Sequence, residues 1–151
     1  MSVQSLRILV VEDEILIALE LESLLQDAGH DVVGIAATSE EALAFAEDLR
    51  PDLAFVDIHL ADGPTGVDVA RHLAERLDVA VLFMTANAKR IPEDCAGALG
   101  VISKPYTEHG IRHAAAYVAS GMGADQEPDV ATVTFFPFTR RDRDDRFARR
   151  A

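Results

Sequence analysis

The chain has 151 residues, 49% hydrophobic and 26% charged, which excludes a wholly disordered protein and fits one domain with a tail. Its 26 acidic and 14 basic residues give a net charge of −12, which excludes a body built around a nucleic-acid groove. The lone Cys95 excludes an internal disulfide, and without a secretion signal or an apolar run near the roughly 20 residues of a membrane span we expect a cytoplasmic protein.

The first part of the chain predicts three strands separated by two helices. The strands are short apolar runs, whereas Ile17, Leu21 and Leu24 fall on one face at helical spacing. In chain order the predicted elements are a strand over 6–11, a helix over 14–28, a strand over 31–36, a helix capped by Ser39 that ends before Pro51, and a strand over 53–56.

The second part continues the alternation after a loop over 62–66. The predicted elements are a helix marked by Val69, Leu73 and Leu77, a strand over 79–84, a short helical stretch over 93–99, a strand over 101–103, and a helix capped by Thr107 that ends at Gly121. Strands that alternate with helices and are apolar on both faces predict a parallel sheet covered on both sides.

This pattern gives an α/β fold class, a doubly wound five-stranded parallel sheet of flavodoxin-like type with strand order 2-1-3-4-5. We expect this domain to occupy residues 5–121. The remaining residues, 122–151, form a short C-terminal extension. Six arginines lie within residues 140–151, and we expect this arginine-rich end to be partly disordered.

Polar side chains follow the predicted strands at the points where the strands end. In the 2-1-3-4-5 order these ends converge on one rim, as expected for a doubly wound sheet. The residues are Glu12, Asp13, Asp57, Thr85 and Lys104. Neighbouring carboxylates need a counter-charge, and oxygen ligands suit Mg²⁺. The rim is therefore equipped for phosphoryl transfer with Asp57 as the nucleophile.

Four segments in this order, LRILVVEDE, FVDIHL, FMTAN and ISKPY, closely resemble the receiver domain of bacterial two-component response regulators. The resemblance covers about residues 5–121 and implies that the domain has the receiver fold and is phosphorylated on Asp57. It also implies an Mg²⁺ site made by Glu12, Asp13, Asp57 and the backbone carbonyl of His59.

The resemblance implies roles for the other rim residues as well. Thr85 matches the switch hydroxyl, and Lys104 matches the phosphate-binding lysine, with Ala86 beside them. The side chains of His59 and Asn87 lie at positions that tune the lifetime of the phosphate. The bond between Lys104 and Pro105 is expected to be cis.

Two features depart from the family pattern. The strand position three residues before Lys104 usually carries an aromatic switch residue, and here it is Val101. The stretch from Thr85 to Lys104 is about one helical turn shorter than usual and contains Pro92, so we expect its helix to be short or distorted. These departures concern the usual output surface and leave the phosphorylation chemistry untouched.

The C-terminal extension is too short for a DNA-binding domain. Only 30 residues follow Gly121, whereas a domain with its own core needs roughly 60. The segment 130–136 could form one strand, and we expect Phe135, Phe136 and Phe138 to dock on the body or on a second subunit of a homodimer.

The sequence therefore predicts a response regulator that accepts a phosphoryl group from a sensor histidine kinase or a histidine phosphotransfer protein. It would act as a phosphate shuttle, a sink, or a regulator of a downstream protein, without contact to DNA or membrane, and with no enzymatic activity beyond its own phosphorylation and dephosphorylation.

Three alternatives stay open. An aspartate-nucleophile phosphatase would carry a second acidic residue where His59 stands. A flavodoxin-like binding module would need a phosphate loop in place of Glu12, Asp13 and Glu14. A DNA-binding regulator would have to use the arginine-rich end.

Overall fold

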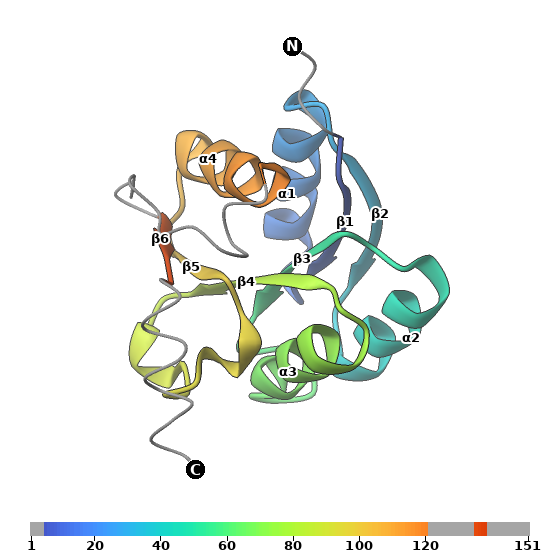
Figure 1. Cartoon of the computed structure of the whole chain (residues 1–151), viewed down its shortest axis with the longest axis vertical. Coiled ribbons are helices and arrows are strands. Elements are labelled where there is room, and N and C mark those ends of the chain that lie inside the picture. The colour runs from blue at the N-terminus through green and yellow to red at the C-terminus, as the bar shows by residue number, and fades with distance from the viewer. Residues whose placement is uncertain (1–4, 121–134, 139–151) are drawn as a thin grey trace.

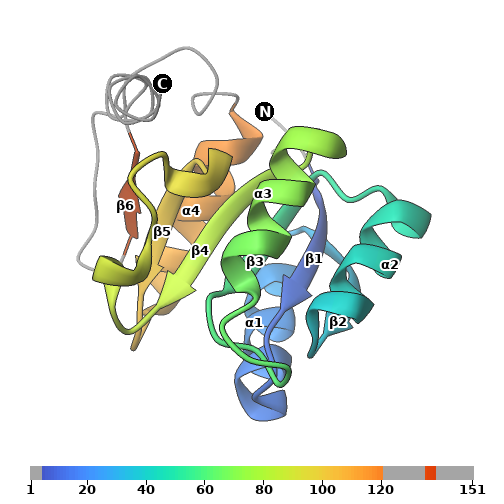
Figure 2. The ribbon, with the colours of Figure 1, turned by 90° about the horizontal axis from the view of Figure 1, so that it is seen from below.

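The computed structural model describes residues 5–120 and 135–138, and its centre is a six-stranded sheet with the order β2-β1-β3-β4-β5-β6 (Figures 1 and 2). The first five strands are parallel and β6 is antiparallel to β5. The strands are β1 (Arg7–Val11), β2 (Asp31–Ala36), β3 (Leu53–Asp57), β4 (Ala80–Thr85), β5 (Gly100–Ser103) and β6 (Phe135–Pro137). The predicted fold class and the order of its five strands are confirmed, and the sixth strand corrects the predicted strand number.

Four helices cover the two faces of the sheet, with α1 and α4 on one side and α2 and α3 on the other (Figure 1). They are α1 (Ile15–Asp27), α2 (Ser39–Leu49), α3 (Gly66–Arg76) and α4 (Glu108–Ala119). None of the helices in the described residues is both long enough and apolar enough to cross a membrane.

Each strand supplies side chains to two cores because successive residues of a strand point to opposite faces. Leu9 and Ala54 pack with α2 and α3, whereas Val10 and Phe55 pack with α1 and α4. This two-sided burial explains why the strands are continuous apolar runs in the sequence.

Two predicted helix caps have different outcomes. Thr107 caps α4, since its hydroxyl accepts a hydrogen bond from the backbone nitrogen of Gly110 at 3.0 Å. Ser39 was expected to cap α2, but Thr38 does so, accepting from Glu41 N at 3.1 Å. The Ser39 side chain instead reaches Asp62 in the loop before α3.

The short helical stretch expected over 93–99 is present as a single 3₁₀ turn, η2 (Cys95–Gly97), and the expected distortion of this region is confirmed. A second 3₁₀ turn, η1 (Ala88–Arg90), precedes it. Cys95 and Ala96 have positive φ angles of 59° and 51°, which an α-helix of L-residues excludes. Arg71 of α3 forms an ion pair with Asp94, which ties this connection to the body.

The sixth strand comes from the predicted C-terminal extension. Phe135 is 2% exposed and meets Tyr117 of α4 edge to face, with ring centroids 5.6 Å apart. Phe138 packs against the core on the α2 and α3 side, whereas Phe136 remains 45% exposed. The predicted docking on the body is thus confirmed for Phe135 and Phe138, whereas Phe136 joins the sheet through its backbone and keeps its side chain half exposed. The rest of the predicted strand, 130–134, and the arginine-rich end with its expected disorder lie outside the described residues.

Candidate functional site

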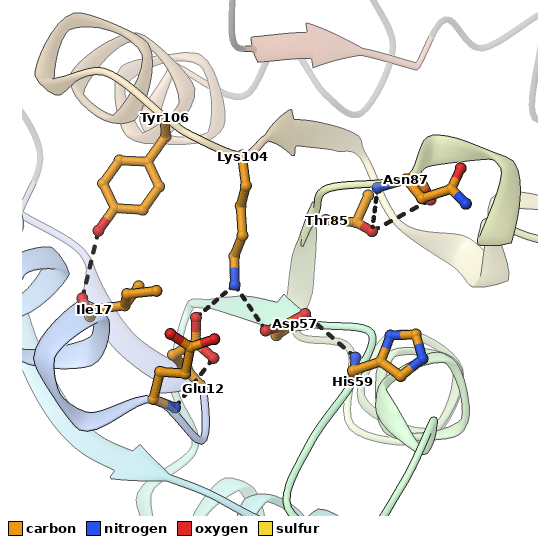
Figure 3. A network of polar contacts seen from close by, with 9 residues as sticks. Glu12, Ile17, Asp57, His59, Thr85, Asn87, Lys104 and Tyr106 are labelled. Carbon is orange, nitrogen blue, oxygen red and sulfur yellow. Dashed lines mark hydrogen bonds and ion pairs between the residues drawn. The ribbon is translucent and has the colours of Figure 1, made fainter.

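The carboxyl ends of β1, β3, β4 and β5 meet at one edge of the sheet, and the predicted rim residues gather there (Figure 3). Glu12 and Asp13 follow β1, Asp57 ends β3, and Thr85 ends β4. Parallel strands bring these positions together although they are far apart in sequence. Lys104 follows β5 directly, and its bond to Pro105 is cis, as expected.

The Lys104 side chain extends between two carboxylates (Figure 3). Its Nζ lies 2.7 Å from Glu12 Oε1 and 2.8 Å from Asp57 Oδ2. The backbone nitrogen of His59 donates to the other oxygen, Asp57 Oδ1, at 3.2 Å. Two donors thus hold the Asp57 carboxylate. Asp57 is 8% exposed and lines a pocket that opens to solvent.

Burial and the contacts between its charged groups act together on the pKa values of this cluster. Glu12 is 1% exposed, and its burial raises its pKa to about 7, with Asp57 adding to the rise and Lys104 opposing it. Burial acts to lower the pKa of Lys104, but its contacts with Asp57 and Glu12 outweigh burial and raise that pKa above its usual value. Lys104 therefore stays charged at neutral pH.

The acidic residues form a suitable set of ligands for a divalent cation. Carboxylate oxygens of Glu12, Asp13 and Asp57 all lie within 4.8 Å of one another. Asp13 is exposed, whereas the other two are buried, so the cluster is open on one side. A hard cation that prefers oxygen ligands and keeps some of its water fits this donor set.

The predicted switch hydroxyl is engaged with its own chain. Thr85 is 5% exposed; its Oγ1 accepts from Asn87 N at 3.0 Å and lies 3.3 Å from the carbonyl oxygen of Asn87. Ala86 and Asn87 line the pocket beside Asp57. Val101 lies elsewhere, in the core on the α2 and α3 side, where it is 5% exposed and pairs with Phe136.

The pocket has one lining residue, Arg90, that was not predicted from the sequence. Arg90 in η1 lines the mouth, with its Nη1 3.1 Å from Nε2 of His59. Glu14, at the start of α1, also lines the pocket. Arg90 carried no signal in the sequence because its place depends on how the shortened connection after β4 folds.

Gly66, the first residue of α3, is a further position whose role only the structure shows. A Cβ at this position would overlap the carbonyl oxygen of Asp57 and lie 2.6 Å from Ile58 Cα. Its backbone nitrogen donates to the carbonyl oxygen of Ile58 at 2.9 Å. The close approach of α3 to the end of β3 therefore requires glycine, and the loop sequence DGPTG was its only signal.

A second, largely apolar pocket adjoins the first, since Ala86 and Lys104 line both. Its other lining residues are Ile17, Glu20, Pro105 and Tyr106. The Tyr106 hydroxyl donates to the carbonyl oxygen of Ile17 at 3.4 Å, and burial raises the pKa of Tyr106 to about 12. The acceptor pocket is thus flanked by an apolar groove between α1 and the start of α4.

Comparison with known proteins gives a family for this arrangement. Residues 8–116 match the model of the response regulator receiver domain. The chain is 46% identical over 84 residues to the phyllosphere-induced regulator PhyR of Methylorubrum extorquens, covering 55% of this chain and 32% of PhyR. It is 33% identical over 104 residues to the transcriptional regulatory protein PdtaR of Mycobacterium tuberculosis, covering 67% of this chain and 50% of PdtaR. The chain thus spans a third to a half of the length of these relatives.

A solved structure of a single domain matches most of this chain. The receiver domain of Erythrobacter litoralis PhyR, solved by NMR in solution, superposes with a TM-score of 0.69 at 33% identity. The match covers 85% of this chain and 97% of that domain. With the sheet order, the clustered strand ends and the family match in agreement, the chain belongs to the response regulator receiver domain family.

Proposed function

We propose that residues 5–121, with Phe135–Phe138 packed on them, accept a phosphoryl group on Asp57. The donor is a phosphohistidine of a sensor histidine kinase or of a histidine phosphotransfer protein. The observation that carries this proposal is the position of Lys104 Nζ, within 2.8 Å of both Glu12 and Asp57. A lysine held at a nucleophilic carboxylate neutralises charge that gathers on transferring phosphoryl oxygens.

In the proposed step an Asp57 oxygen attacks phosphorus, and the bond between phosphorus and the histidine nitrogen breaks. The electron pair of that bond stays on the imidazole. Asp57 is the terminal residue of β3, so the sheet fixes its backbone, and His59 N orients the carboxylate from the other side. Such positioning supplies much of the catalysis in phosphoryl transfer.

Glu12, Asp13 and Asp57 are the residues that would hold Mg²⁺, with the backbone carbonyl of His59 as a further proposed ligand. The fit rests on the three carboxylates within 4.8 Å. When bound, the cation would neutralise negative charge on the phosphoryl oxygens. The chain's own residues bring the acceptor and Lys104 together around that position.

The remaining rim residues have proposed roles in the response. Thr85, now bonded to the backbone of Asn87, would release that bond to reach the phosphoryl group, next to Ala86. Asn87 and His59 would influence how fast water reaches the phosphate. Val101 has no ring to relocate, which favours a shuttle or sink over a strong conformational effector.

An exposed apolar surface supports docking of a protein donor. Ile15, Leu16 and Leu19 of α1 are 59%, 79% and 46% exposed, and they make up three of the four large apolar side chains that are exposed among the described residues. They follow Glu14, which lines the acceptor pocket. Apolar side chains in a contiguous exposed patch are typical of a protein interface. We place the histidine-bearing donor there.

The test is incorporation of phosphate from acetyl phosphate in the presence of Mg²⁺, followed by intact mass. Wild-type protein is expected to gain one phosphoryl group, and Asp57→Asn none. Asp68→Asn, an exposed carboxylate in the first turn of α3, is the matched control and should behave as wild type. Incorporation that persists in Asp57→Asn would refute the acceptor assignment.

Docking on α1 has a separate test. Leu16→Glu should leave phosphorylation by acetyl phosphate unchanged, because the small donor needs no protein surface. The same variant should slow transfer from a phosphorylated histidine kinase by about tenfold or more. Equal transfer rates for wild type and Leu16→Glu would exclude this surface as the docking site.

A further inference from the structure

A cationic side chain at the mouth of the acceptor pocket has no part in the chemistry described so far. Arg90 lines the pocket that also contains Asp57, His59, Thr85 and Lys104. Its Nη1 lies 3.1 Å from His59 Nε2, across the pocket mouth between the loop after β3 and the turn after β4. Within residues 5–120 and 135–138, Arg90 forms no ion pair with a carboxylate.

The contact between Arg90 and His59 fixes the role of the imidazole. A guanidinium only donates hydrogen bonds, so Nε2 of His59 is the acceptor in this contact. An imidazole nitrogen carries no negative charge, so this contact does not compensate the charge of Arg90. His59 therefore holds the Arg90 guanidinium at the pocket mouth only weakly, and a doubly charged anion would bind the guanidinium in its place.

The backbone beneath Arg90 is tied to the acceptor site. Asn87 O accepts from Arg90 N at 3.2 Å, and Asn87 Oδ1 accepts from Lys89 N at 3.1 Å. Asn87 is in turn bonded to the Thr85 hydroxyl. The 3₁₀ turn η1, which follows the end of β4 closely, thus places Arg90 at the pocket.

Even with the proposed Mg²⁺ at the three carboxylates, the charge balance of the pocket leaves a place for a second basic side chain. Lys104 already contacts two carboxylates, Glu12 and Asp57. A phosphoryl group brings two further negative charges and three acceptor oxygens. The planar fork of an arginine binds two such oxygens at once, which an ammonium cannot do.

We propose that Arg90 is an anion-binding residue of the acceptor pocket. Its guanidinium gives up the contact with His59 and binds the phosphoryl oxygens of the incoming donor. The inference rests on the proposed function of Asp57. In the step that it assists with acetyl phosphate, an Asp57 oxygen attacks phosphorus, the bond to the acetyl oxygen breaks, and acetate leaves with the electron pair. Arg90 forms no covalent bond and binds the donor by charge and hydrogen bonds.

The test measures the rate of Asp57 phosphorylation against acetyl phosphate concentration, with Mg²⁺ present and intact mass as the readout. Arg90→Gln should raise the half-saturating concentration about tenfold, as expected for loss of a charged hydrogen bond, with the maximal rate changed less than about twofold. Arg90→Lys should recover part of this loss. Lys89→Gln, which removes the neighbouring exposed cation of the same turn, should match wild type.

A double variant separates direct binding from an effect through His59. His59→Ala removes the resting partner, and Arg90→Gln should still cost about tenfold in this background. The inference is overturned if Arg90→Gln equals Lys89→Gln, or if its effect disappears once His59 is removed. In either case phosphorylation of wild type still supports the proposed function, whereas failure of wild-type incorporation refutes both.

Discussion

The carboxyl end and the outer edge of β5 lead to regions that differ in kind. After its carboxyl end, Lys104 joins a polar pocket whose lining includes Asp57 and Thr85, the last residues of β3 and β4. Along its open edge, β5 pairs with β6 through Phe135, Phe136 and Pro137 (Figure 2). The first region is polar and open to solvent, and the second is apolar and completes the core.

Both regions depend on a glycine that lets backbone approach backbone. At the acceptor end Gly66 brings α3 against Asp57, and at the edge Gly100 makes room for β6. The comparison teaches that the acceptor chemistry and the packing of β6 use separate parts of the molecule. Changes at the edge should lower stability without altering phosphorylation, whereas changes at Gly66 should affect both.

Gly66→Ala is expected to have the largest effect. The added Cβ would overlap the backbone of Asp57 and Ile58, which cannot rotate away, so the free energy of unfolding should fall by about 3 kcal/mol or more. Because the acceptor itself must shift, phosphorylation by acetyl phosphate should slow by about a hundredfold. Urea unfolding and mass measurements check the two effects.

The matched control is Gly34→Ala in β2, where the added Cβ would meet only side-chain atoms at 3.4 Å. This variant should unfold at nearly the wild-type urea concentration. If Gly66→Ala behaved like Gly34→Ala, the close approach of α3 to Asp57 would be refuted.

Phe135→Ala should lower the free energy of unfolding by about 3 kcal/mol, because a nearly fully buried ring is removed from the core. Phe136→Ala, one residue along the same strand and 45% exposed, should cost less than about 1 kcal/mol. Folded Phe135→Ala should still be phosphorylated at the wild-type rate. Slow phosphorylation would show that β6 and the acceptor pocket are coupled.

Gly100→Ala should have a smaller effect, about 1 kcal/mol or more, because its Cβ would lie 3.0 Å from Pro137 Cα and from the Phe135 ring. These atoms belong to β6, so the cost should shrink when it is measured in the Phe135→Ala background. Additive costs in the double variant would mean that Gly100 is needed for a reason other than the docking of β6.

The smallest expected effect is on the pH dependence of stability. It concerns His30, which lies at the amino-terminal ends of the strands, opposite the acceptor pocket. His30 is 7% exposed, its Nδ1 accepts from Leu6 N at 3.1 Å, and burial lowers its pKa. Below the ordinary pKa of 6.5 the unfolded chain binds more protons at His30 than the folded chain does. The contribution of His30 to the free energy of unfolding is therefore retained above that pH and is lost as the pH falls through the lowered pKa.

His30→Asn keeps an acceptor oxygen near the position of Nδ1 but does not titrate. Urea unfolding at about pH 7 and about pH 5 should show a smaller loss of stability for this variant than for wild type. Equal losses would assign the acid sensitivity to other groups.

Elements with local sequence signals could be predicted from the sequence, whereas contacts between distant segments could not. Apolar runs and helical spacing located five strands and four helices, with β2 predicted at its observed bounds, since each element buries the face that its own residues define. Thr38 caps α2 in place of Ser39 because both adjacent hydroxyls could cap this helix. The Ser39 hydroxyl instead donates to Asp62 in the loop before α3.

The sequence by itself determined the sheet order and the convergence of Glu12, Asp13, Asp57 and Lys104, because parallel strands with right-handed crossovers leave few arrangements. Only the tertiary structure decided that Phe135 completes the sheet, that Gly66 contacts Asp57 and that Arg90 faces His59. These contacts join segments that carry no matching pattern, and their free energy comes from packing and charge across the folded chain.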